Sequence, residues 1–242
     1  TGQVTQEQVS HLAATIATFH KDAVSNDEIS RGGAMDILKQ NIVENVAQTN
    51  NAINLGLISR NQFDTIRDYS LDFLDRQAPL FASRKDDGFV RDCHGDLHSG
   101  QIFLANDVYI TDCIEFNHRF RYIDVASDIA FLAMDLDYFG RPDLSRHLID
   151  KYLHQTDDQQ ATILLDFYKC YRAYVRGKVT SFRLDSEHLS DGDKRELNFT
   201  ARQYFNLAYS YTTRDQQPTL FILSGLAGTG KSTISQETME YC

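Results

Sequence analysis

The sequence predicts an α+β fold that is predominantly helical and that continues into the first part of an α/β unit. Three observations carry this prediction. Apolar residues recur at helical spacing over most of the chain, two short β-favouring runs lie close together near its middle, and a glycine-rich loop follows an apolar run near its end. With 242 residues, of which 42% are hydrophobic, the chain has enough material for one large domain or one and a half ordinary ones.

Helices are expected on both sides of the two β-favouring runs. Residues Thr5 to Gln8 form a capping box before a first apolar series, and Ser59 to Gln62 repeat that signal before a second series. Further along the chain, apolar periodicity predicts four more helices, over residues 124–138, 143–154, 158–185 and 193–212.

The two β-favouring runs predict a hairpin. They cover residues 102–104 and 108–110, and a turn-prone linker of three residues separates them. Paired strands lie about 4.8 Å apart, so Gln101 before the first strand and Asp112 after the second should become neighbours. Asp96 lies on the loop that enters the hairpin. Three oxygen-bearing side chains are therefore expected at one end of a rigid element.

Such a set of side chains suits the handling of a metal-bound phosphate. Phosphoryl transfer depends mostly on positioning and on charge neutralisation. One carboxylate orients or deprotonates the attacking hydroxyl, and hard oxygen ligands hold the Mg²⁺ that bridges the phosphates. The composition of this loop therefore points to phosphate chemistry.

The residues of this loop also resemble a known family. The segment His94-Gly95-Asp96-Leu97-His98, followed by Ile110-Thr111-Asp112, is similar to the catalytic loop and the metal-binding Asp of aminoglycoside phosphotransferase-like kinases, relatives of protein kinases. Residues 113–117 and 120–132 resemble a subgroup in which this domain is fused to a P-loop kinase. The resemblance implies the C-terminal lobe of a protein-kinase-like fold.

The resemblance also implies functions for single residues. Asp96 would be the catalytic base, and Asp112 would bind Mg²⁺ together with the residue at position 101. The family usually places Asn there, whereas this chain has Gln101, which keeps the amide oxygen on a side chain one methylene longer. Because Mg²⁺ demands near-ideal octahedral geometry, this departure bears directly on the metal site.

A second phosphate-binding signature lies near the end of the chain. Residues 219–224 predict a buried strand, and the complete Walker A sequence Gly-Leu-Ala-Gly-Thr-Gly-Lys-Ser-Thr follows at residues 225–233. In such a loop the backbone amides surround the phosphates, Lys231 reaches the terminal phosphates and Ser232 ligates Mg²⁺. The expected nucleotide-binding residues are Gly225, Gly228, Gly230, Lys231, Ser232 and Thr233.

We expect three segments along the chain: a helical kinase-like lobe at 1–212, a linker at 213–217 and the start of a P-loop domain at 218–242. Ten residues follow Ser232, whereas a βαβ unit needs about 30, and no glycine-rich ATP-covering lobe precedes Asp96. The sequence is therefore expected to be a fragment that spans a domain junction and that has little kinase activity by itself.

Charge and cysteine content restrict the class of protein. The net charge of −10 argues against a long groove for DNA or RNA and favours a small substrate. The four cysteines show no C-x-x-C spacing. No apolar run approaches the length of a membrane span, and the N-terminal residues show no signal-peptide pattern. We expect a cytoplasmic protein that uses ATP, Mg²⁺ and a small hydroxylated molecule, with no nucleic-acid or membrane partner.

Several residues of the central loop allow a second interpretation. His94, Asp96 and His98 could together bind zinc, although the sequence supplies no further convincing ligand, and His94 could instead hold the loop through backbone hydrogen bonds. Asp124 and Asp128 are expected to begin a helix, and the family resemblance adds that an Asp near this helix start braces the catalytic loop.

Further charged residues are also open to two interpretations. Glu115 could contact metal or substrate, or form a salt bridge with Arg119 or Arg121. Basic residues recur on the predicted helix at 158–185, where a solvated face is the simpler interpretation and steering of an anionic substrate is the alternative. These basic residues are Lys169, Arg172, Arg176 and Arg183.

Three functional hypotheses follow from the two signatures. The first is an ATP-dependent phosphotransferase that acts on a hydroxyl of a small molecule and is fused to a P-loop ATP-binding domain. The second is a catalytically degenerate kinase-like lobe that binds a ligand or regulates the P-loop domain, and Gln101 is the feature that favours it. In the third, the P-loop is the sole catalyst.

Overall fold

The computed structural model describes residues 4–105, 107–186 and 188–213. Contacts within the chain separate residues 1–212 from residues 213–242, and the first unit is described by itself. The predicted strand at 219–224 and the Walker A loop at 225–233, including Lys231 and Ser232, lie outside the described residues.

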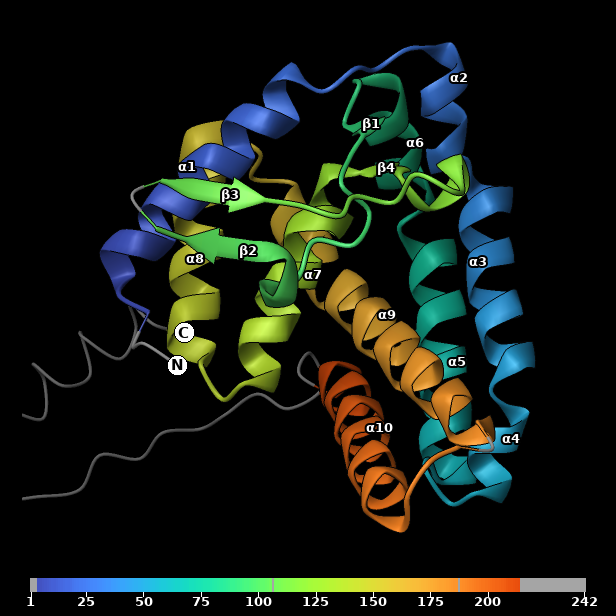
Figure 1. The fold of residues 1–242 in the computed structure, drawn as a ribbon. Coiled ribbons are helices and arrows are strands. Elements are labelled where there is room, and N and C mark those ends of the chain that lie inside the picture. Colours follow the sequence, from blue (N-terminus) through green and yellow to red (C-terminus); the bar gives the residue numbers. More distant parts are fainter. Residues whose placement is uncertain (1–3, 106, 187, 214–242) are drawn as a thin grey trace, which may run out of the picture. The chain divides into compact units, whose positions relative to one another are not determined.

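The first unit is α+β and predominantly helical, as the sequence predicts (Figure 1). Its helices are α1 (Gln6–Asp22), α2 (Asp27–Ser30), α3 (Met35–Gln48), α4 (Asn50–Asn54), α5 (Arg60–Arg76), α6 (Ala78–Asp86), α7 (Val125–Tyr138), α8 (Pro142–Thr156), α9 (Ala161–Phe182) and α10 (Asp191–Tyr211). Its strands are β1 (Val90–Asp92), β2 (Ile102–Leu104), β3 (Val108–Ile110) and β4 (Tyr122–Asp124). Short 3₁₀ turns cover Arg31–Gly33, Ser99–Gln101, His118–Phe120 and Arg183–Asp185.

Local sequence signals set most of these helices. Both predicted capping boxes are confirmed: Thr5 and Gln8 begin α1, and Ser59 and Gln62 begin α5, each pair exchanging side-chain and backbone hydrogen bonds. The four predicted downstream helices correspond to α7, α8, α9 and α10, with ends displaced by three residues or fewer.

The strands form two separate antiparallel pairs. The predicted hairpin is confirmed as β2–β3, in which Ile102 faces Ile110 and Phe103 faces Tyr109. The sequence did not predict the second pair, β1 with β4, in which Val90 faces Asp124. This second pair brings together the two ends of the segment that lies between β1 and β4. Asp96, Gln101 and Asp112, the three predicted phosphate-handling residues of this unit, all belong to that segment.

Two hydrophobic clusters hold the helices together. The first joins α1, α7 and α8 with the N-terminal half of α9, and it includes Leu97 of the predicted catalytic loop. The second joins α5, α7 and the middle of α9 with α10, which lies alongside α9 in Figure 1. Because α7 and α9 belong to both clusters, they form the shared support of the loop system.

Two other expectations concern the cysteines and the membrane. Cys93, Cys113 and Cys170 are free thiols, as expected, and Cys242 lies outside the described residues. Burial raises the pKa of the Cys93 and Cys170 thiols, so these two are unreactive core residues.

Within the described residues, no helix combines the length and the apolar character that crossing a bilayer requires.

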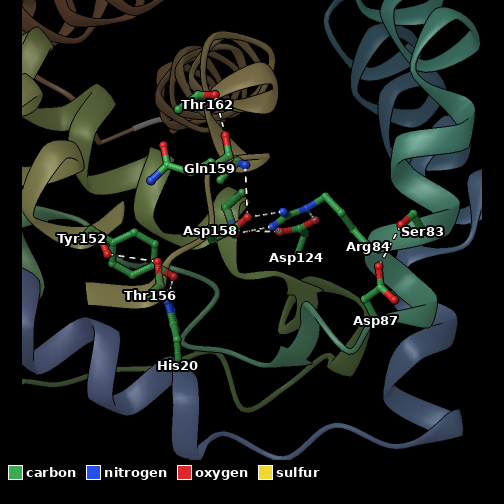
Figure 2. Close-up of polar contacts among 12 residues, drawn as sticks. His20, Ser83, Arg84, Asp87, Asp124, Tyr152, Thr156, Asp158, Gln159 and Thr162 are labelled. Atoms are coloured by element: carbon green, nitrogen blue, oxygen red, sulfur yellow. Dashed lines mark hydrogen bonds and ion pairs between the residues drawn. The ribbon is translucent and has the colours of Figure 1, made fainter. Parts of the chain in front are cut away.

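A buried ion-pair group fixes the start of two helices relative to α6 (Figure 2). Arg84 of α6 is fully buried and binds Asp124 through Nε and Nη2, at 2.7 and 2.8 Å, and Asp158 through Nη1, at 2.6 Å. Asp124 also accepts the Ala126 N–H at the start of α7, and Asp158 accepts the Ala161 N–H at the start of α9. Burial opposes the charge of Arg84, but the hydrogen bonds of the two carboxylates more than offset it and raise the pKa.

We predict that Arg84→Met destabilises the protein strongly, because it leaves two carboxylates buried without their cation. Removing one member of a buried ion pair costs about 3–5 kcal/mol. As a matched control, Arg67→Met on α5 removes a half-exposed partner of Asp64 and Asp68, and such surface pairs contribute about 0–1 kcal/mol. Urea unfolding followed by the helical circular dichroism signal measures both, and equal midpoints for the two variants would contradict the prediction.

Candidate functional site

The loop from His94 to Gln101 connects β1 to β2, and its path depends on a glycine. Gly95 has φ of +83°, a conformation that residues with a side chain rarely adopt. A Cβ at this position would also lie 2.6 Å from the carbonyl oxygen of Phe120. The loop therefore passes directly beneath the segment that leads into β4.

The carboxylate of Asp128, in the first turn of α7, holds this loop from below. It is fully buried and accepts the backbone N–H groups of His94, at 3.0 Å, and Gly95, at 2.9 Å. It also lies 3.2 Å from Nε2 of His20 on α1. Burial favours the neutral acid, but the hydrogen bond to His20 and the nearby positive charge hold the pKa of Asp128 below its usual value. The predicted bracing function is confirmed for Asp128, and Asp124 caps α7 as expected.

His94 connects the entering loop to the residue before Asp112. Its Nε2 lies 2.7 Å from the carbonyl oxygen of Thr111, and its Nδ1 accepts the Asp96 N–H at 3.3 Å. The backbone carbonyl of His94 accepts the Ile114 N–H at 3.0 Å. The interpretation of His94 as a residue that holds the loop through backbone hydrogen bonds is confirmed.

The zinc interpretation does not fit this geometry. Both ring nitrogens of His94 are engaged by backbone groups, so this histidine has no lone pair available for a metal. Among the described residues, one group of His, Cys or acidic side chains comes close enough to suggest a metal, and it consists of His20, Cys93 and Asp128. In this group, Asp128 already accepts the N–H groups of His94 and Gly95. Nδ1 of His20 is hydrogen-bonded to the Tyr152 hydroxyl at 2.7 Å.

Asp96 is half-buried and is oriented by His98. Nε2 of His98 lies 3.4 Å from Oδ2 of Asp96, and Nδ1 of the same ring accepts the Gly100 N–H at 3.1 Å. The second contact fixes the ring so that its remaining nitrogen faces the carboxylate. Burial raises the pKa of Asp96, but the hydrogen bond from His98 and the positive charges of Arg172 and Arg176 more than offset burial and hold this pKa below its usual value.

Gln101 and Asp112 come together through the backbone of the hairpin. The Thr111 N–H donates to the Gln101 carbonyl oxygen at 3.0 Å, which sets Asp112 one residue beyond the paired position. Asp112 is exposed and has φ of +59°, a left-handed conformation that is uncommon for a residue with a side chain. Within the described part of the chain, neither side chain forms an ion pair or a hydrogen bond, so their oxygens are available to a ligand.

The basic residues of α9 correct the simpler interpretation. Arg172 is buried, and its Nη1 donates to the Gly95 carbonyl oxygen at 2.9 Å, while its guanidinium lies over the Phe131 ring. Lys169 is buried against Asp137 and Ser145. The predicted solvated face is therefore wrong for these two residues, because α9 is covered by α7 on this side. Arg183, in the 3₁₀ turn that follows α9, is exposed.

Of the two alternatives for Glu115, the salt bridge with Arg119 or Arg121 is wrong. Arg119 instead binds Glu44 of α3, with a distance of 3.0 Å from Nη1 to Oε1, and Arg121 binds Asp92, with 3.2 Å from Nη2 to Oδ2. Both acidic partners lie far from these arginines in the sequence, which is why local spacing suggested Glu115. The side chain of Glu115 is exposed.

A cavity of about 300 Å³ opens beside Asp96. Helix α3, one face of α9 and the loop before β4 line it, and Gly95 and Asp96 lie in its wall. Lys178 of α9, which the sequence did not single out, lines the cavity too, and it binds Asn45 and Gln48 through Nζ. The site thus combines an oriented carboxylate with a partly open cavity next to it.

Comparison with known proteins gives relatives but no activity. The chain is similar to uncharacterized proteins from two strains of Mycobacterium tuberculosis and one of Mycobacterium bovis. Each is 33% identical over 232 residues, which is 95% of this chain and 45% of the relative, so the chain spans about half the length of the curated relatives it matches. No family model and no solved structure matches.

We predict that Asp128→Asn destabilises the protein at neutral pH by roughly 3 kcal/mol or more, because an amide cannot accept from two N–H groups and His20 in the same way. The folded-state pKa of Asp128 is depressed, so its contribution is present above the unfolded pKa and is lost as pH falls through the folded pKa. The difference between wild type and variant should therefore shrink below about pH 4.

Urea unfolding at a series of pH values measures this difference. Asp150→Asn, on the exposed side of α8, is the control and should change stability by less than about 0.5 kcal/mol. A difference for Asp128→Asn that stays constant down to the lowest pH would show that its charge does not brace the loop.

Proposed function

We propose that the intact protein containing this chain is an ATP-dependent phosphotransferase that acts on a hydroxyl of a small molecule. The observation that carries the proposal is the position of Asp96: a half-buried carboxylate, oriented by His98, in the wall of a 300 Å³ cavity. A hydroxyl bound in that cavity would meet an acceptor for its proton. A cavity of this size suits a small molecule.

The lowered pKa of Asp96 suits this function. The group is ionised at neutral pH, so it can accept a hydrogen bond from the substrate hydroxyl and orient it for attack. A carboxylate with a low pKa is a weak base, which is adequate for phosphoryl transfer because positioning and charge neutralisation supply most of the rate. Arg172, held by the Gly95 carbonyl, keeps this part of the loop in place.

The second part of the proposal is that Asp112 and Gln101 hold Mg²⁺. Carboxylate and amide oxygens are the hard ligands that Mg²⁺ takes, and these two side chains have no competing partner in the described residues. The left-handed backbone of Asp112 supports the idea of a functional position, since such conformations cluster at functional sites. When bound, Mg²⁺ would neutralise charge on the phosphates of ATP.

The wider protein is proposed to be a fusion. The resemblance to aminoglycoside phosphotransferase-like kinases supports a kinase-like lobe at 1–212, and the Walker A sequence at 225–233 supports a second, P-loop ATP-binding domain that includes Lys231 and Ser232. The matching relatives extend well beyond the region they share with this chain, which leaves room for both domains. Its free cysteines are typical of a cytoplasmic location.

A regulatory lobe without catalysis is the second candidate, and Gln101 favours it. The backbone of Gln101 is fixed by Thr111, so its longer side chain moves the amide oxygen away from where Asn would present it. Mg²⁺ tolerates such displacement poorly. In this case the cavity would bind a ligand whose presence is transmitted to the P-loop domain.

We predict that Asp96→Asn lowers ATP-dependent phosphorylation of small hydroxylated acceptors by roughly 10²–10⁴-fold, the usual contribution of a general base. The full-length protein is used with Lys231→Ala in the background, so that the P-loop does not contribute. Release of ADP and mass spectrometry of the acceptors measure the reaction. Asp107→Asn, in the exposed hairpin turn, is the matched control. Activity that survives Asp96→Asn would support the regulatory or the P-loop-only hypothesis instead.

We predict that Gln101→Asn lowers the Mg²⁺ concentration needed for half-maximal activity, because the shorter side chain restores the usual ligand position. Gln101→Ala should raise that concentration. Both are measured by Mg²⁺ titration of ADP release in the same Lys231→Ala background. An unchanged Mg²⁺ dependence in both variants would mean that position 101 does not bind the metal.

A further inference from the structure

The cavity beside Asp96 follows one face of α9 for several turns. Its wall includes Tyr171, Arg172, Val175 and Lys178 from that helix. Arg172 is bonded to the Gly95 carbonyl and therefore marks the end near Asp96. Lys178 lies six residues further along α9, which corresponds to about 9 Å of helix axis. A ligand with a hydroxyl near Asp96 could therefore reach Lys178 with its other end.

The charges that face this cavity are distributed unevenly along it once internal ion pairs are considered. Arg119 in the wall is neutralised by Glu44, whose pKa is lowered to about 2 mainly by the hydrogen bond from Arg119. Asp124 in the wall is bound by Arg84, which also binds Asp158. Outside these ion pairs, the described wall carries Asp96, Arg172 and Lys178, and Arg172 lies near Asp96 through its bond to the Gly95 carbonyl. The charge at the far end of the cavity from Asp96 is therefore the positive charge of Lys178.

Lys178 lies in the part of the cavity wall away from Asp96, and one N–H group of its ammonium is available to a ligand. It is 91% buried, and its ammonium donates to two neutral amide oxygens, Oδ1 of Asn45 and Oε1 of Gln48. An ammonium has three N–H donors, so one remains. Burial without a direct carboxylate partner lowers the pKa of Lys178. Glu44 lies near enough to offset part of this effect, but it is bound to Arg119, so an anionic ligand would supply the direct counter-charge that Lys178 lacks.

Two neighbouring asparagines in the same wall have buried atoms without a partner. Nδ2 of Asn45 lacks an acceptor, and Oδ1 of Asn41 lacks a donor. Buried polar atoms are nearly always hydrogen-bonded to protein, water or ligand, so these two atoms of the cavity wall are available to polar groups of a ligand. An anionic oxygen could accept from Asn45 as well as from Lys178, and a ligand hydroxyl could donate to Asn41.

We propose that the acceptor of the phosphoryl group is a hydroxylated small molecule with an anionic group, a carboxylate or a phosphate, bound by Lys178 and Asn45. The proposal rests on the proposed function of Asp96, which receives the hydroxyl at the other end. The middle of the molecule contacts Ile42, Tyr171 and Val175, so it carries an apolar or aromatic body. Polycationic acceptors, such as aminoglycosides, would place ammonium groups against Lys178 and are disfavoured.

The test compares probes that share one phenol skeleton and differ in charge. They are 3-(4-hydroxyphenyl)propionate, its amide, tyramine, and 2-(4-hydroxyphenyl)ethyl phosphate, each titrated into the full-length protein by calorimetry without ATP. We expect the carboxylate or the phosphate to bind at least ten-fold more tightly than the amide and tyramine, and their ratio identifies which anion the site prefers. Equal binding of all probes, tighter binding of tyramine, or no binding of any probe would overturn the proposal.

Variants then locate the binding. Lys178→Met should reduce the anionic probes to the affinity of the amide, Lys178→Glu should reverse the preference in favour of tyramine, and Asn45→Leu should weaken the anions several-fold. Lys194→Met, on the exposed face of α10, is the matched control and should change nothing. Circular dichroism checks the folding of each variant, and an anion preference that survives all three cavity substitutions would overturn the proposal.

Failure of this proposal is distinguishable from failure of the proposed function. Asp96→Asn should keep anion binding while losing phosphoryl transfer. Asp96-dependent phosphorylation of neutral or cationic acceptors alone would leave the proposed function standing and refute the anionic acceptor. Lys178-dependent anion binding without any Asp96-dependent transfer would refute the proposed function and leave the anion site standing.

Discussion

The carboxylate of Asp128 is the fixed point from which the site is built. It is completely buried, yet it stays charged because two backbone N–H groups and His20 donate to it. Those two N–H groups belong to His94 and Gly95, so the start of α7 determines where the loop begins. The side chain of His94 is in turn hydrogen-bonded to the carbonyl oxygen of Thr111, the residue before Asp112. A single buried charge thus sets the relative positions of both predicted phosphate-handling segments of this unit.

Other buried charges extend the same principle to the surrounding helices. Arg84 fixes the starts of α7 and α9 through Asp124 and Asp158, and Arg172 returns from α9 to the Gly95 carbonyl. The loop is therefore held from α7 below and from α9 at the side. Such support explains how a loop with so little regular structure can present Asp96 in a defined orientation, which site chemistry requires to within a fraction of an ångström.

The parts that local sequence determines were predictable, and the parts that depend on distant contacts were not. Capping boxes and apolar spacing specify α1 and α5, and the hairpin needs only its own residues. The β1–β4 pair joins two short strands whose paired residues are 30 to 34 positions apart, and neither strand has a strong β-favouring pattern, so the local sequence does not predict this pair. Burial of Arg172 was missed for the same reason. Arg172 donates to backbone carbonyls, and every residue has a carbonyl, so the sequence does not indicate which ones it binds.

The electrostatics of the site also restrict the kind of chemistry it can perform. His98 and the cations around Asp96 stabilise its ionised form, so this carboxylate binds a proton weakly. A reaction that needed a strong base, such as proton abstraction from carbon, would require the opposite arrangement, with burial dominating and the pKa raised. Transfer of a phosphoryl group needs an oriented hydroxyl and stabilisation of the charge on the phosphate, and positioning and electrostatics supply most of its catalysis. The same positive surroundings that weaken Asp96 as a base would favour an anionic phosphate beside it, and this joint effect is the physical reason for proposing phosphoryl transfer at this loop.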